Sequence, residues 1–178
     1  MNAMSFLVST VFDLYLMVVI IRFWLQLVRA DFYNPFSQFV VKATQPIVAP
    51  MRRILPSMGS IDTASVVLAF LVVLAKMLVL TLITGEGIDI GILLFAVIKN
   101  AGVLLFWMLL IRAVLSWFNQ GYNPVVMIMT QLTEPILAPI RRIIPAIGGL
   151  DLSVLVLFIA MNFINILFSQ YIPFWANI

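Results

Sequence analysis

The chain contains no cysteine and no histidine, and only 10% of its 178 residues are charged. These absences exclude disulfide bridges, thiol catalysis, Cys/His zinc sites and histidine-bound haem within the chain, and they remove the commonest general base. The net charge of +3 comes from few and scattered basic residues. We therefore expect no nucleic-acid partner, no metal and no cofactor, and without a visible nucleophile–base set we expect no enzyme activity.

Apolar residues are abundant instead, at 64% of the chain with a mean hydropathy of +1.18. Soluble domains are about half apolar, and a chain this short has no large interior to bury the excess. Four stretches reach the roughly 20 apolar residues that cross a bilayer as a helix. The sequence therefore predicts an all-α membrane protein with four transmembrane helices, at Phe6–Val28, Thr63–Ile83, Ile92–Trp117 and Leu152–Ile172.

Basic residues are confined to particular loops. The two long loops carry six of them, namely Arg29, Lys42, Arg52, Arg53, Arg141 and Arg142. The short loop between the second and third spans carries only Glu86 and Asp89. Since loops rich in Lys and Arg stay in the cytoplasm, we expect both long loops inside and both termini on the outer side.

The sequence repeats itself at a spacing of 89 residues. Asn34-Pro35 recurs as Asn123-Pro124, and a Pro-x-x-x-Pro-x-Arg-Arg-x-x-Pro motif occurs at 46–56 and again at 135–145. Each copy, 1–89 and 90–178, consists of a span, a long loop and a span in the same order. We therefore expect two parallel tandem repeats related by an axis along the membrane normal.

Each long loop is expected to contain a short amphipathic helix. The Asn-Pro pair is a typical helix start, and apolar residues follow at helical spacing. We expect about 11 residues, near Pro35–Thr44 and Pro124–Thr133, because the prolines of the motif should end each helix before Pro46 or Pro135. Such a helix is too short to span and can lie in the membrane interface, although an ordinary soluble helix remains an alternative.

Charged residues flank these loop helices. Arg52, Arg53, Arg141 and Arg142 are expected to bind anionic lipid headgroups, at about 1 kcal/mol each, or only to fix the topology. Asp62 and Asp151 precede the second span of each copy. An aspartate there can cap the helix and complement its dipole.

These residues resemble the YggT (YlmG) family over nearly the whole chain, in both copies. The resemblance is carried by Arg22-Phe-Trp, by the stretch 29–38, by the doubled proline–arginine motif and by the Gly-x-x-Asp ending. One departure is Val154, where the family usually has proline. The resemblance implies a multi-pass protein of the bacterial cytoplasmic membrane, or of chloroplasts. It also implies links to osmotic stress and potassium homeostasis, to cell division or nucleoid organisation, or, for plastid relatives, to cytochrome b6 maturation. It brings no agreed biochemical activity and no catalytic residues.

Charges inside the predicted spans need partners or water. Arg22 and Arg112 are repeat equivalents near the cytoplasmic ends. They either extend to the interface, or anchor the loops by binding loop carbonyls or the carboxylates Asp62 and Asp151.

Polar residues also lie in the outer half of the spans. Asp13 and Lys76 are each about eight residues from an outer end, so we predict an ion pair between them. With Lys99, Asn162 and Asn165 they form an expected intramembrane polar cluster. It serves either as polar contact between helices or as an outward-facing vestibule for an ion or small solute.

Taken together, these features favour a non-enzymatic scaffold or assembly factor with lipid-binding cytoplasmic loops. Its expected partners are anionic lipids, with other proteins or a second copy of the chain as possible further partners. The alternative is a channel or transporter for potassium or small osmolytes. The polar positions leave the middle of the membrane dry, which favours the scaffold, because a pore needs them to line a continuous path.

Overall fold

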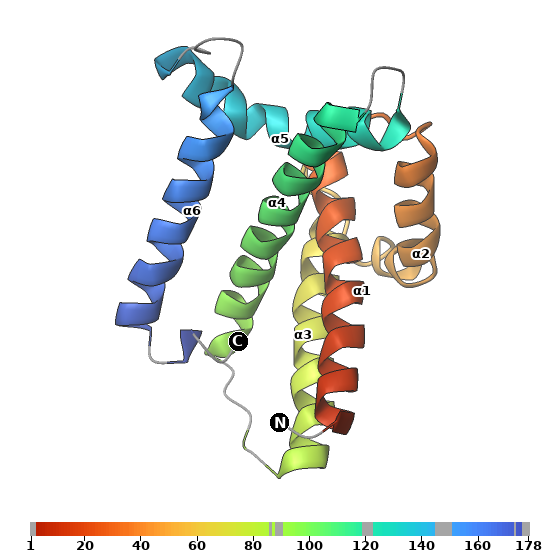
Figure 1. The fold of residues 1–178 in the computed structure, drawn as a ribbon. Coiled ribbons are helices and arrows are strands. Elements are labelled where there is room, and N and C mark those ends of the chain that lie inside the picture. The colour runs from red at the N-terminus through yellow and green to blue at the C-terminus, as the bar shows by residue number, and fades with distance from the viewer. Residues whose placement is uncertain are drawn as a thin grey trace. The chain divides into compact units, whose positions relative to one another are not determined.

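The computed structural model describes residues 3–85, 87, 91–118, 123–144, 151–172 and 174–175, without the side chains of 116–118. Glu86, Asp89, Pro145 and Gly148 therefore lie outside the described residues. The described part is all-helical (Figure 1), with six helices: α1 (Ala3–Leu27), α2 (Pro35–Met51), α3 (Thr63–Thr84), α4 (Ile92–Phe118), α5 (Pro124–Ile143) and α6 (Leu152–Tyr171).

Helices α1, α3, α4 and α6 confirm the four predicted spans to within a few residues at each end. They contain 25, 22, 27 and 20 residues, enough to cross the apolar core of a bilayer. Large apolar side chains point out of them, including Leu82, Phe163 and Ile159, which are 86%, 64% and 61% exposed. Such outward apolar surface suits lipid and would be unfavourable in water.

The chain forms two compact units, Met1–Ala101 and Gly102–Ile178. In the first unit, α1 and α3 lie side by side and run antiparallel (Figure 1), so the start of α1 and the end of α3 are at the same end. Both helices also contact α2. The core of this unit is aliphatic, with Leu16, Val19, Leu25, Val40, Val48 and Leu68 at 3% exposure or less.

In the second unit, α5 joins the C-terminal part of α4 to α6. Leu109 of α4, Leu137 of α5 and Leu157 of α6 form its buried cluster, with partly buried apolar side chains around them. Figure 1 shows α5 lying across the direction of α6 rather than along it. The helix between the two spans is thus held by apolar contacts to both of them.

The predicted ends of the loop helices are wrong. Helix α2 has 17 residues and contains Pro46 and Pro50, and α5 has 20 residues and contains Pro135 and Pro139. Prolines four apart fall on one face of a helix, and all four are exposed. The carbonyls that lose their N–H partners therefore face outward, where water or headgroups can solvate them, so the helix continues.

The predicted helix starts are confirmed. The Asn34 side chain accepts a hydrogen bond from the N–H of Phe36 at 2.9 Å, and Asn123 accepts one from Val125 at 2.9 Å. Proline follows each asparagine at the first helical position, where its missing N–H has no cost.

Candidate functional site

A buried arginine in the first span binds the helix that follows it. Arg22 of α1 donates from Nη1 to the carbonyl of Val41 at 3.2 Å and to Oγ1 of Thr44 at 2.6 Å, and from Nη2 to Oε1 of Gln45 at 2.8 Å. The hydroxyl of Thr44 in turn donates a hydrogen bond to the carbonyl of Val40 at 2.7 Å. One guanidinium thus fixes a full turn of α2 against α1.

The same arginine reaches the carboxylate that precedes α3. Arg22 Nε lies 3.7 Å from Oδ2 of Asp62, and Arg52 Nη2 lies 2.6 Å from the same oxygen. Ser65 donates to it as well, at 2.6 Å. We call Arg22, Thr44, Gln45, Arg52 and Asp62 the first network, because they connect α1, α2 and α3.

The charge of Asp62 is strongly stabilised. Its side chain is fully buried, and burial alone would raise the pKa of the carboxyl. Hydrogen bonds from Arg52 and Ser65, together with the charges of Arg52 and Arg22, outweigh that effect and hold the pKa below its ordinary value. Asp62 is therefore ionised at neutral pH and is the only carboxylate of the first network.

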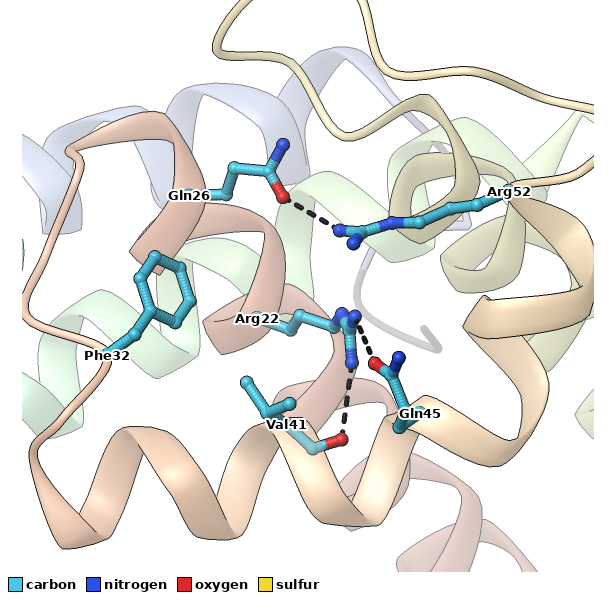
Figure 2. Close-up of a pocket in the computed structure, with 6 residues that line it drawn as sticks. All are labelled: Arg22, Gln26, Phe32, Val41, Gln45 and Arg52. Atoms are coloured by element: carbon cyan, nitrogen blue, oxygen red, sulfur yellow. Dashed lines mark hydrogen bonds between the residues drawn. The ribbon is translucent and has the colours of Figure 1, made fainter.

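An open cavity of about 400 Å³ lies beside this network, lined by Arg22, Gln26, Phe32, Val41, Gln45 and Arg52. Figure 2 shows Arg22 at its centre, with Gln26 and Arg52 on one side and Val41 and Gln45 on the other. Gln26 accepts a hydrogen bond from Arg52 Nη2 at 2.8 Å. The lining is rich in donors, and its two charged groups are both guanidiniums.

The second repeat contains an equivalent network with different pairing. Arg112 donates to Oγ1 of Thr133 at 2.5 Å and to Oε2 of Glu134 at 3.3 Å. Arg141 binds Oε1 of the same glutamate at 2.6 Å and Oδ2 of Asp151 at 2.5 Å. We call these five residues the second network, in which Glu134 bridges the two arginines.

The carboxylates of the second network are more exposed than Asp62 of the first. The Asp151 side chain is 36% exposed. Burial would raise its pKa, but hydrogen bonds from Arg141 and Ser153 outweigh this and lower it. The hydrogen bond to Asp151 in turn raises the pKa of Arg141.

Arg22 makes the contacts expected of a loop anchor, with both a loop carbonyl and Asp62, and the anchoring role itself stays a prediction. For Arg112 the predicted partner is wrong. Among the described residues it pairs with Glu134 and not with Asp151, because Glu134 offers a nearer carboxylate on α5.

The four loop arginines divide into two kinds. Arg52 and Arg141 bind the chain's own aspartates, although their side chains stay partly exposed, at 37% and 33%. A strong carboxylate partner ten residues along the chain explains this. Arg53 and Arg142 are exposed, and their side chains make no hydrogen bond or ion pair with any described residue. Headgroup binding itself stays a prediction for all four.

The predicted capping role holds in one copy only. Asp151 accepts a hydrogen bond from the N–H of Ser153 at 3.1 Å, whereas the Asp62 side chain makes no such bond to the start of α3. Two arginines and Ser65 occupy the Asp62 carboxylate instead.

The predicted pair between Asp13 and Lys76 is present in the structure. Lys76 Nζ lies 2.7 Å from Oδ1 and 2.8 Å from Oδ2 of Asp13, and Ser9 donates to Oδ2 at 3.2 Å. Asn165 accepts a hydrogen bond from the indole of Trp175 at 2.8 Å. Asn162 and Asn165 belong to the second unit, so the cluster of five that includes Lys99 stays a prediction.

Sequence reasoning missed Thr44 and Thr133, and the pair Gln45 and Glu134. The 89-residue spacing places each at the same position of its copy, which was the available signal. Identical threonines indicate a shared role, and a glutamine against a glutamate indicates a difference in charge between the copies.

Comparison with known proteins identifies the family of the chain. A family model described as CCB3/YggT matches the chain in two parts, residues 1–83 and 91–172. A Vibrio alginolyticus protein, named as an uncharacterized protein in the proC 3′ region, is 59% identical over the full length of both chains. The Escherichia coli K12 protein YggT is 44% identical over 99% of this chain and 95% of its own. A Pseudomonas aeruginosa protein, PA0392, is 43% identical over 93% of this chain and 88% of its own. No solved structure matches. The chain is therefore a member of the CCB3/YggT family and a multi-pass membrane protein with four candidate spans.

Proposed function

We propose that the protein is a non-enzymatic scaffold or assembly factor of the bacterial cytoplasmic membrane. In this proposal the two copies are parallel repeats with both termini outside. Helices α2 and α5 lie in the cytoplasmic interface and present lipid-binding surfaces there. The link to osmotic-stress tolerance comes from family resemblance alone. Anionic lipids are the partners, and other proteins or a second copy are further candidates.

The observation that carries the proposal is the attachment of each loop helix to the spans. Arg22 uses three hydrogen bonds to hold α2, and Arg112 holds α5 through Thr133 and Glu134. An interfacial helix fixed in this way presents a constant surface to lipid and partners, which is what a scaffold needs. It also commits the intramembrane arginines to anchoring rather than to conduction.

A pair of side chains at the end of each loop helix supports the lipid contact. Arg53 and Arg142 are exposed, and the next residues, Ile54 and Ile143, are 83% and 81% exposed. A cation beside an outward isoleucine is typical of segments that place charge among headgroups and an apolar chain below them. The pattern occurs in both copies although the networks beside it differ.

The test is the lipid preference of purified protein. Wild type and the double variant Arg53→Gln/Arg142→Gln are exposed to equal mixtures of phosphatidylglycerol and phosphatidylcholine, and the retained lipids are counted by native mass spectrometry. We expect wild type to retain phosphatidylglycerol preferentially, and the double variant to lose most of that preference. The control Arg29→Gln/Lys42→Gln removes the same charge from other exposed positions. Unchanged preference in the double variant, or equal loss in the control, contradicts the proposed contact.

A flux assay separates the scaffold from the alternative function. Protein reconstituted into liposomes is assayed for potassium and osmolyte efflux against protein-free vesicles. We expect equal rates. Efflux that depends on the protein would replace the scaffold with the channel or transporter.

A further inference from the structure

The two networks differ in net charge. In the first, Arg22 and Arg52 face one carboxylate, Asp62, which leaves one positive charge in excess. In the second, the two arginines face two carboxylates, Glu134 and Asp151, and the charges balance. The whole difference arises at one position, where Gln45 of the first copy replaces the glutamate of the second.

Beside this excess charge lie donors that make no hydrogen bond in the described part of the chain, although Arg22 Nε keeps its ion-pair contact with Asp62 at 3.7 Å. Arg22 Nε is buried and makes no hydrogen bond there, and neither does Arg52 Nη1. Gln26 and Gln45 also line this cavity, and their amide oxygens accept hydrogen bonds from Arg52 and Arg22. Buried donors are nearly always paired, so Arg22 Nε calls for an acceptor, and the partly exposed Arg52 Nη1 can bind the same group.

We propose that the cavity between α1 and α2 binds a phosphate-type anion, which supplies the second negative charge that Glu134 supplies in the second copy. Two guanidiniums offer several donors to a group with several charged oxygens, and arginine pairs with phosphate through parallel hydrogen bonds. A cavity of about 400 Å³ has room for more than the phosphate itself, and Phe32 provides an apolar wall.

The same chemistry is available from a lipid headgroup or from free phosphate, and the assay separates them. Purified wild-type protein is titrated with inorganic phosphate, and separately with short-chain phosphatidylglycerol, at constant ionic strength. Binding is read from the unfolding midpoint and, for phosphate, by equilibrium dialysis with radiolabelled phosphate. Stabilisation by either ligand supports the proposal and identifies its source. No response to either one overturns it.

The deciding variants exchange the residues that distinguish the copies. Gln45→Glu places a carboxylate between the arginines, so we expect it to fold and to bind the responding ligand at least tenfold more weakly. Glu134→Gln removes the bridging carboxylate of the second network, so we expect it to gain a second binding site. Lys42→Gln changes the net charge by the same amount as Gln45→Glu at an exposed position outside the cavity, so we expect no change in binding.

Each outcome has a definite meaning. Equal affinity in wild type and Gln45→Glu, or equal weakening in Lys42→Gln, rejects the cavity as the site. Arg53 and Arg142 are unaltered in these variants, so this proposal and the lipid contact proposed above can fail independently.

Discussion

The first and second networks both attach a loop helix to the spans, but they differ in burial and in charge. In both, an arginine inside a span holds the loop helix through a threonine, and a second arginine binds the aspartate before the next span. The first network depends on one carboxylate, Asp62, which is fully buried. The second shares its charges between two carboxylates that are 41% and 36% exposed.

This difference distinguishes the contacts that both copies share from the excess charge that only the first copy has. The arginine–threonine and arginine–aspartate contacts occur twice, so they belong to the frame that holds each loop helix. The buried excess charge occurs once, beside the cavity of the first copy. The contacts shared by both copies can therefore stay the same while the first copy alone gains the anion-binding function proposed above.

The largest expected effect concerns the carboxylates. Asp62→Asn leaves Arg22 and Arg52 together without a counter-charge, and removing one partner of a buried ion pair costs about 3–5 kcal/mol. Asp151→Asn removes a pair that is partly exposed, and such pairs are worth about 1 kcal/mol or less. A denaturant titration of each variant in detergent gives its free energy of unfolding and so measures both changes.

A matched set of variants sharpens this prediction. Asp62→Asn combined with Gln45→Glu returns a carboxylate to the first network, so part of the lost stability should be recovered. Equal losses for Asp62→Asn and Asp151→Asn would show that burial does not distinguish the networks.

The next effect concerns a pair that only the first copy has. The position equivalent to Lys76 in the second copy is Asn165. Asp13→Leu or Lys76→Leu alone should destabilise the protein, because each leaves a charge within a span, and the double change should recover much of the loss. Both side chains are partly exposed, at 29% and 18%, and membrane proteins find other polar partners when unfolded. We therefore expect a coupling of about 1 kcal/mol in a double-mutant cycle. Strict additivity of the two single changes would contradict it.

The spans and their main contacts were predictable because the physical demands are strong. A run of about 20 apolar residues has few structures open to it, and a charge within it needs a partner. The sequence therefore predicted Asp13 with Lys76 and offered Asp62 as one alternative partner for Arg22, and both pairs are present. The repeat also made the asparagine caps predictable, because the same Asn-Pro pair occurs at the equivalent position of both copies.

The errors arose where the outcome depends on which face of a helix is exposed. The prolines of α2 and α5 were expected to end both helices, but a sequence does not say that the freed carbonyls point outward. The pairing of Arg112 with Glu134 was missed for a related reason. Asp151 is equivalent to Asp62 in sequence, yet Glu134 is the nearer acceptor in space, and only the packing of α5 decides between them.

A smaller effect should be equal in the two copies. Thr44 and Thr133 are both fully buried, and each accepts a bond from an intramembrane arginine, at 2.6 and 2.5 Å. Valine keeps the shape and removes the hydroxyl, so Thr44→Val and Thr133→Val should each cost about 1 kcal/mol, the net worth of one buried hydrogen bond. The measurement is again the free energy of unfolding. A large cost in only one copy would mean that the threonine contact is not part of the shared frame.

The smallest effect is on pH dependence. The pKa values of Asp62 and Asp151 are lowered by their arginine and serine partners, from an ordinary value of 3.8. A carboxylate with a lowered pKa in the folded state contributes stability that is complete above the unfolded value and is lost as the pH falls through the folded one. The unfolding midpoint should therefore be insensitive to these two groups at neutral pH and decrease only below about pH 4. Asp62→Asn and Asp151→Asn should each flatten that acid decrease, because each removes one of the two titrating groups. A decrease of undiminished size in both variants would mean that other carboxylates cause the acid loss and that the networks are insensitive to it.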